Sequence, residues 1–142
     1  MKLVVASDHA GRRLKDIIFR HLAERGRVPQ DMGVDLSVEK ADYPDYARPL
    51  AQAVAAGEYD LGFLVCGTGT GMALAANRVP GARAANCTNE LMARMARAHN
   101  NANILALGER ILGEGLALAI VDAFLETAFE GGRHQTRLDK IS

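Results

Sequence analysis

The chain has 142 residues, of which 49% are hydrophobic and 24% charged. This size and composition indicate one globular domain spanning residues 1–142 and exclude a disordered or fibrous protein. Basic and acidic side chains both number 17, so the formal net charge is zero and no overall positive field exists to attract nucleic acid or an anionic membrane. We therefore expect a small-molecule partner, no nucleic acid and no membrane.

Cysteine usage and hydropathy indicate a cytoplasmic protein. Cys66 and Cys87 form no CxxC pattern, which argues against a disulfide framework or a zinc site. The first residues lack the apolar run of a signal peptide, and no apolar run reaches the roughly 18 residues that a membrane span needs. Thirteen of the 17 cations are arginine, whose planar fork suits a phosphate or a carboxylate.

Five short apolar runs alternate with segments of helical period along the chain. Such alternation is typical of proteins in which helices cover both faces of a parallel sheet. The predicted fold is α/β: a doubly wound five-stranded parallel sheet in an αβα sandwich of Rossmann-like type. The predicted strands are residues 3–7, 28–32, 61–65, 82–86 and 103–107.

The first four helices are predicted from apolar spacing and from residues that begin or end helices. The first ends at Gly26, and the second opens at Pro44 and ends at Gly57. The third covers residues 72–79. Thr88 is expected to cap the fourth, whose inward stripe would be Leu91, Met92, Met95 and Ala96.

The last predicted helix, residues 114–129, carries two apolar stripes. One stripe can cover the sheet, and the other needs a further cover, which predicts a partner subunit. A helix buried deeply within its own chain is the alternative. The stripes are Leu116, Ile120, Ala123 and Phe124 on one side and Leu118, Val121 and Leu125 on the other.

Reactive side chains cluster beside three predicted strands. In an open parallel sheet, ligands bind outside the carboxyl ends of the strands. Ser-Asp-His-Ala-Gly follows the first strand at 7–11, and Cys-Gly-Thr-Gly-Thr-Gly follows the third at 66–71. His-Asn-Asn-Ala-Asn lies just before the fifth strand at 99–103. We expect these segments to supply the site.

Cys66 faces a glycine loop that opens a helix, an environment that favours a thiolate nucleophile or base. The alternative is a buried and inert cysteine, which is also our expectation for Cys87. Gly67, Gly69 and Gly71 leave backbone amides open to a ligand oxygen, so the loop can cradle an oxyanion. It matches neither GxGxxG nor GxxxxGK[ST], and a purely structural tight turn remains the alternative.

The four histidines, at positions 9, 21, 99 and 134, show no metal-ligand spacing, so we expect no metal. His99 ends a helix beside polar residues and is a candidate proton donor to a sugar oxygen. His21 is expected on the surface.

Basic residues near the C-terminus suggest a phosphate clamp. Arg133 and Arg137 share one face if their segment is helical, with Arg110 as a candidate third member. A solvated terminal turn is the alternative, and a helix-start charge is the alternative for Arg110.

Together these segments resemble the type B ribose-5-phosphate isomerase family, which includes galactose-6-phosphate isomerase subunits. The resemblance covers essentially the whole chain in order. The matching pieces are SDHAG at 7–11, DYP at 42–44, CGTGTG at 66–71, AAN at 75–77, HN at 99–100, NILALGERILG at 103–113 and EGGRHQTR at 130–137.

The resemblance implies an aldose–ketose isomerase that needs no cofactor and works as a homodimer or a dimer of dimers. Cys66 would move the proton between C1 and C2, and His99, from the neighbouring subunit, would assist opening of the sugar ring. Some family members lack this cysteine and instead carry a glutamate in the glycine loop, at the position where this chain has Met72. The substrate contacts would come from Asp8, His9, Gly67, Thr68, Gly69, Thr70, Gly71, Asn100, Arg110, Arg133 and Arg137.

The chemistry agrees with this assignment. Proton abstraction beside a carbonyl needs a base and donors aimed at the developing oxyanion, and the Thr68 hydroxyl can pass a proton between O1 and O2. Ribose 5-phosphate is the expected substrate. Allose 6-phosphate, galactose 6-phosphate and tetrose phosphates need the same step, and a phosphosugar-binding module without catalysis stays open. The absence of a nearby resolving cysteine weakens a thiol redox role.

Overall fold

The computed structural model describes residues 1–141 and contains one parallel sheet. The strand order is β2-β1-β3-β5-β4, and every neighbouring pair is parallel. The predicted α/β fold with a five-stranded parallel sheet is therefore confirmed. The strands are β1 (Leu3–Ser7), β2 (Gln30–Asp31), β3 (Leu61–Cys66), β4 (Ala84–Asn86) and β5 (Ile104–Gly108).

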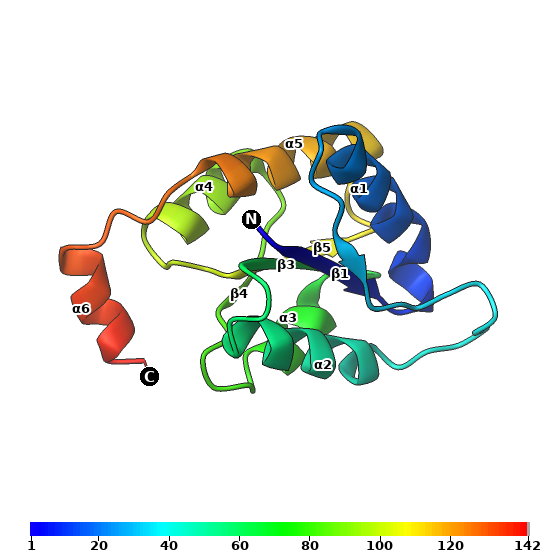
Figure 1. The fold of residues 1–142 in the computed structure, drawn as a ribbon, viewed down its shortest axis with the longest axis horizontal. Helices are drawn as coiled ribbons and strands as arrows, with labels where there is room; N and C mark the ends of the chain where they lie inside the picture. Colours follow the sequence, from blue (N-terminus) through cyan, green and yellow to red (C-terminus); the bar gives the residue numbers. More distant parts are fainter. Residues whose placement is uncertain (142) are drawn as a thin grey trace.

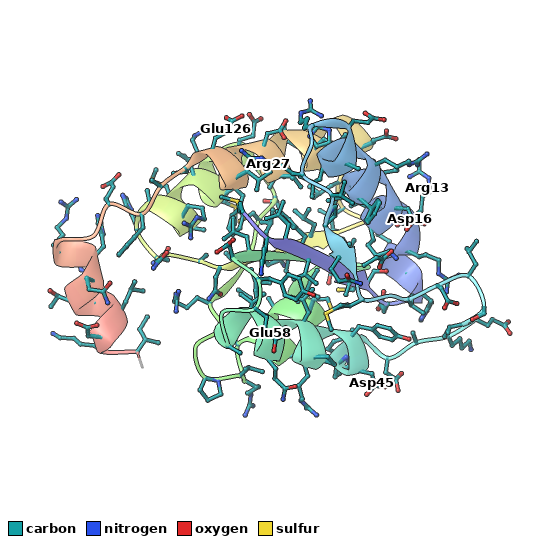
Figure 2. All side chains as sticks on the ribbon, in the orientation of Figure 1. Arg13, Asp16, Arg27, Asp45, Glu58 and Glu126 are labelled. Atoms are coloured by element: carbon teal, nitrogen blue, oxygen red, sulfur yellow. The ribbon has the colours of Figure 1, made fainter. Side chains whose placement is uncertain are left out.

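Helices lie on both faces of the sheet. Figure 1 shows α1, α4 and α5 over one face and α2 and α3 over the other, whereas α6 stands apart from the sheet. The helical elements are the 3-10 turn η1 (His9–Gly11), α1 (Arg12–Glu24), α2 (Tyr43–Ala55), α3 (Thr70–Ala76), α4 (Glu90–Ala98), α5 (Glu114–Glu126) and α6 (Arg133–Asp139). Figure 2 shows side chains filling the spaces between these layers, with Arg13 and Asp45 pointing outward.

Side chains of the strands point alternately to the two faces, and this alternation divides the core in two. Phe63 and Val65 of β3 pack with residues of α1 and α5. Leu64 and Cys66 pack with residues of α2 and α3. Each fully buried large apolar side chain contributes about 1.5–3 kcal/mol. The register that buries β3 therefore also fixes the face on which Cys66 lies.

The direction of winding reverses between β1 and β3. The chain leaves β1 toward β2 through α1, then returns to β3 through α2, which lies on the opposite face. Ligands of open α/β sheets bind at such a switch point, outside the carboxyl ends of the strands. Ser7 ends β1 opposite Val65, and Cys66 ends β3 opposite Gly108 of β5.

Several predicted boundaries need correction. The predicted strand 28–32 is reduced to Gln30–Asp31, because Val28 is 69% exposed and Pro29 has no N–H for the ladder. The third helix covers Thr70–Ala76 and so begins inside the glycine loop. The last helix ends at Glu126 and not at residue 129.

The fourth helix differs most from its prediction. Asn89, and not Thr88, is its cap, because the Asn89 side chain accepts a hydrogen bond from the Met92 amide at 2.8 Å. The predicted inward stripe is wrong at three of its four positions, since Leu91, Met92 and Met95 are exposed, whereas Ala96 is buried as predicted. The buried positions of this helix are Ala93, Ala96 and Ala98. Small residues lie against α5, and the larger ones face outward.

Most of α5 is covered within its own chain. Ile120, Val121 and Phe124 are fully buried although they come from both predicted stripes. Most of both stripes is therefore covered without a partner, although Leu116 is 40% exposed and Leu118 and Leu125 are only partly buried. Exposed large apolar side chains also lie on α3 and α4, at Leu74, Leu91, Met92 and Met95. No helix within residues 1–141 is long and apolar enough to cross a membrane.

Candidate active site

Cys66 ends β3 at the carboxyl edge of the sheet and is 5% exposed. Its sulfur accepts a hydrogen bond from the Gly69 amide at 3.1 Å. The turn that follows the strand folds back over the sulfur, and α3 begins at Thr70 directly after it. A backbone N–H directed at sulfur stabilises negative charge there. The arrangement suits a thiol that acts as a base.

Close packing explains why the loop contains glycine. Gly69 has φ +83°, a left-handed conformation that other residues adopt with strain, and a Cβ there would lie 2.3 Å from Asn86 Oδ1. On the facing strand, a Cβ on Gly108 would lie 2.6 Å from the Thr68 backbone. The loop is thus held against β5 by backbone contact, which fixes its amides close to Cys66.

The segment after β1 places two predicted site residues at the same edge. Asp8 is buried, and its Oδ1 accepts hydrogen bonds from the amides of Ala10 and Gly11 at 2.9 and 3.0 Å. His9 is exposed, and its Nδ1 accepts from the Ala41 amide at 3.0 Å. The same Nδ1 also lies 3.1 Å from the Ala41 carbonyl oxygen, so either tautomer of the ring finds a partner in Ala41.

Arg110 and Thr68 complete this group. The Arg110 amide donates to the Gly67 carbonyl at 3.0 Å, and its side chain lies against Gly67, where a Cβ would be 3.4 Å from Nη1. Thr68 is exposed, and its hydroxyl accepts from the Thr70 amide at 3.3 Å. The structure therefore brings together Asp8, His9, Cys66, Gly67–Gly71 and Arg110 at one edge.

Two residues beside the loop were not assigned roles from the sequence. The ring of Tyr43 packs on Gly71, where a Cβ would lie 2.8 Å from Cε1. Asn86 Nδ2 donates to the Thr68 carbonyl at 3.3 Å, while its buried Oδ1 has no hydrogen-bond partner within residues 1–141. Asn86 ends a predicted strand, so the rule that ligands bind at carboxyl ends could have found it.

The remaining predicted residues lie elsewhere. His99 follows α4 and Asn100 comes next, before β5 begins at Ile104, which places both at the amino edge of the sheet. Within one chain, this segment therefore lies at the opposite edge of the sheet from the segments around Asp8 and Cys66. β5 separates the two edges and, at about 3.3 Å per residue, its five residues span roughly 15 Å.

Arg133 and Arg137 lie on α6, beyond this amino edge (Figure 1). The segment is helical, so the two exposed arginines are one turn apart on one face. His134, between them, is 5% exposed and stacks on His99 with ring centroids 4.1 Å apart. Residues 130–141 form a C-terminal tail that contains α6. The amide of Glu130 donates to the Ala98 carbonyl at 3.0 Å and holds this tail against the end of α4.

Three side chains of this tail region could hold a metal. The ligand atoms of His99, Glu130 and His134 all lie within 4.8 Å of one another. Burial lowers the pKa of His134, as does the charge of His99, whereas Glu130 raises it. The scattered spacing of the histidines gave no sign of this grouping. His21 is likewise not a surface residue, since its side chain is 9% exposed and its Nε2 lies 2.8 Å from Asp122 Oδ1.

The two cysteines differ in their surroundings. Both are buried, but burial raises the pKa of the Cys87 thiol to about 11. Its sulfur lies 3.9 Å from the Ala85 carbonyl, a weak contact that stabilises only the protonated form. The protonated thiol of Cys87 is therefore favoured at neutral pH, in agreement with the structural role expected from its sequence context.

Two of the hollows on the surface lie near these segments, and Cys66 lines neither of the two. One, of about 880 Å³, lies between the start of α1 and the segment 31–37. The other, of about 290 Å³, lies beside the glycine loop and is lined by Thr70, Asn77 and Asn86.

Comparison with known proteins assigns the family. The ribose/galactose isomerase family matches residues 3–141 of this chain. The chain belongs to this family. The resemblance seen in the sequence is confirmed, and with it the sugar-phosphate isomerase class.

Relatives in this family match over almost their full length. Ribose-5-phosphate isomerase B of Escherichia coli is 48% identical, with 99% of this chain and 94% of that protein covered. The structure of the Clostridium thermocellum ribose-5-phosphate isomerase B is 54% identical, with a TM-score of 0.97 over 99% of this chain and 95% of that one. The Mycoplasma genitalium enzyme, solved with bound ribulose 5-phosphate, is 45% identical, with a TM-score of 0.94 over 99% and 93%.

Proposed function

We propose that this protein interconverts ribose 5-phosphate and ribulose 5-phosphate. The observation that supports this most is the Cys66 sulfur at the end of β3, with the Gly69 amide 3.1 Å away and the glycine loop around it. A relative of the same family has been solved with ribulose 5-phosphate bound. A base beside oxyanion donors is the arrangement that enediolate chemistry requires.

The reaction moves two protons and leaves the oxidation level of the whole sugar unchanged. Cys66, as thiolate, removes the proton from C2 of the open-chain aldose and returns it to C1. The proton on O2 passes to O1, with the Thr68 hydroxyl as relay. Backbone amides of Gly67–Gly71 stabilise the enediolate oxygens between these steps. Asp8 and His9 line the sugar, and no metal or cofactor takes part.

The site is completed by a second copy of the chain. Cys66 and His99 lie at opposite edges of the same sheet, so one chain cannot present both to one sugar. In a two-fold dimer, His99 and Asn100 of a partner subunit face Cys66, with His99 assisting ring opening. Arg110 of one chain and Arg133 and Arg137 of the other then hold the phosphate.

A panel of phosphorylated four-, five- and six-carbon aldoses tests the activity. We expect ribose 5-phosphate to show the highest kcat/KM, by roughly ten-fold or more, since one carbon in a shaped pocket changes binding by about 1–3 kcal/mol. A higher value for a six-carbon or four-carbon sugar would correct the substrate and keep the reaction. Binding of every sugar without any isomer formed would favour a binding module instead.

Mixing two inactive variants tests the shared site. Cys66→Ala and His99→Asn proteins are combined in equal amounts under conditions where subunits exchange. About half of the dimers are then mixed, so roughly a quarter of all sites regain both residues. Activity near that level is expected. If verified exchange restores nothing, both residues act from one chain and the shared arrangement is wrong.

A further inference from the structure

Three side chains with metal-binding atoms meet at the amino edge of the sheet. His99 comes from the end of α4, Glu130 from the segment before α6, and His134 from α6 itself. Glu130 Oε1 lies 3.9 Å from His99 Nε2 and 3.6 Å from His134 Nε2. The fold thus creates a grouping that the separation of these residues in the sequence conceals.

The Nε2 atom of His134 differs from the other donor atoms in its surroundings. His134 is 5% exposed, and its buried Nε2 has no hydrogen-bond partner within residues 1–141. Glu130 Oε1, at 3.6 Å, is too distant for a hydrogen bond. A buried polar nitrogen without a partner costs free energy, and a ligand that takes its lone pair removes that cost.

We propose that His99, Glu130 and His134 bind a zinc ion, and that the bound ion inhibits the enzyme reversibly. Two imidazoles and one carboxylate form a donor set that zinc accepts, with a fourth position open to water or a phosphate oxygen. Binding of the ion does not depend on the proposed function. The inhibition does, because it follows from withdrawing His99 from the sugar.

The present geometry is close to a ligand set but not yet one. Zinc–ligand bonds of about 2.0–2.1 Å in a tetrahedron place donor atoms roughly 3.3 Å apart. The two distances from Glu130 Oε1, 3.6 and 3.9 Å, must therefore contract by a few tenths of an ångström, and the donor atoms of His99 and His134, within 4.8 Å of each other, must also approach. The stacked rings are 11° from parallel, so their in-plane lone pairs lie in nearly parallel planes, and one ring must tilt before both can reach one ion. The His99 and Glu130 side chains are 38% and 57% exposed and have room to move toward the fixed His134.

Nearby charge limits the affinity. Arg133 and Arg137 flank His134 on α6 and repel a cation. Both are exposed, so solvent and salt screen them. With one carboxylate opposing two screened cations, we expect binding in the micromolar range and not the tighter binding of closed structural zinc sites.

Zinc titration of the full-length Cys66→Ser protein, followed by calorimetry, tests the site. Serine at position 66 prevents the active-site thiolate from acting as the ligand, and Cys87 is buried with its pKa raised to about 11. We expect one zinc ion per chain. Glu130→Gln in this background should weaken binding at least ten-fold. The matched control is Glu126→Gln, which removes the exposed carboxylate labelled on α5 in Figure 2 and should change nothing.

The outcomes separate the possibilities. If zinc binds the wild type but not the Cys66→Ser protein, the ion sits on the thiolate and the proposed site is wrong. Equal effects of the two glutamate changes would also overturn it. In the wild type, loss of isomerase activity on adding zinc and its return with a chelator support the inhibitory role. Zinc binding without inhibition would refute only the inhibitory role. The calorimetric titration does not use isomerase activity, so it tests the zinc site even if the proposed function is wrong.

Discussion

The carboxyl edge around Cys66 and the tail around α6 are built in different ways. At the carboxyl edge, buried strands and glycines bring backbone against backbone: a Cβ on Gly11 would lie 2.3 Å from the Val65 carbonyl oxygen. In the tail, a seven-residue helix exposes all its side chains except His134 and Leu138. One region is fixed by the core, whereas the other is fastened by a few contacts to the end of α4.

This difference matches the tasks proposed for the two regions. Proton transfer needs the base and the oxyanion donors held within a fraction of an ångström, which packed elements provide. Phosphate binding by long arginine side chains tolerates looser support, because charge acts over several ångströms. Elements with few buried contacts are also the ones that open most readily. The chemistry should therefore be sensitive to the core, and substrate affinity should be sensitive to the tail.

The largest effect is expected from the base. Cys66→Ala should lower kcat on the order of a thousand-fold, because a positioned acid or base contributes about 10²–10⁴. Substrate affinity should hardly change, since the phosphate contacts remain. Cys87→Ala is the matched control and should keep near-normal kcat, because that thiol is protonated at neutral pH. Steady-state kinetics on both proteins decide the matter, and near-normal turnover in a folded Cys66→Ala protein would refute the assignment.

The next effect concerns stability at the carboxyl edge. Gly11→Ala should destabilise the protein by about 3 kcal/mol or more, because the new methyl group meets the rigid backbone of β3. The midpoint of thermal unfolding should fall by roughly 10 °C. Gly115→Ala in the first turn of α5 has nothing within 4 Å of its Cβ and should stabilise by about 0.5 kcal/mol. Changes of the same sign in both would contradict the packing account.

The same contrast explains what the sequence could predict. The sheet and its strands follow from apolar runs, and Cys66 with its glycines follows from the rule on carboxyl ends, because these features are local. The face of α4 could not be read, since methionine and leucine appear inward by hydropathy while the close approach of α5 selects Ala93 and Ala96. The large residues of α4 therefore lie on the surface.

The contacts of the tail could not be predicted from the sequence for another reason. The pairing of His99 with His134 joins segments separated by a strand and a helix, and no spacing rule connects them. His99 adjoins the amino end of β5, whereas Cys66 ends β3 at the carboxyl edge. The two edges of the sheet can be told apart only from the direction in which the strand runs, and that direction is known once the sheet is known to be parallel.

A smaller effect is expected from the phosphate contacts. Arg133→Ala or Arg137→Ala should each raise KM by roughly ten-fold, because a charge-assisted hydrogen bond contributes about 1.5–3 kcal/mol and exposure reduces that value. The midpoint of unfolding should stay within about a degree. Arg20→Ala removes an exposed arginine from α1 and should leave KM unchanged. If all three variants bind the sugar phosphate alike, the tail is not part of its site.

The smallest effect tests how loosely the tail is held. Gly131 has φ +69°, and nothing lies within 4 Å of a Cβ built there, so Gly131→Ala adds only backbone strain of about 1 kcal/mol. That strain works against the bond from the Glu130 amide to the Ala98 carbonyl and lowers the docked fraction of α6. KM should rise by up to about five-fold, the factor that 1 kcal/mol allows, with the unfolding midpoint nearly constant.

Gly131→Asn is the control for this last change, because asparagine tolerates the left-handed conformation better than alanine does. It should raise KM less than the alanine variant while adding a larger side chain. An equal rise in both would mean that bulk at this position, and not backbone strain, disturbs the sugar phosphate. A fall in the unfolding midpoint as large as that of Gly11→Ala would mean that the tail is as firmly tied to the core as the carboxyl edge.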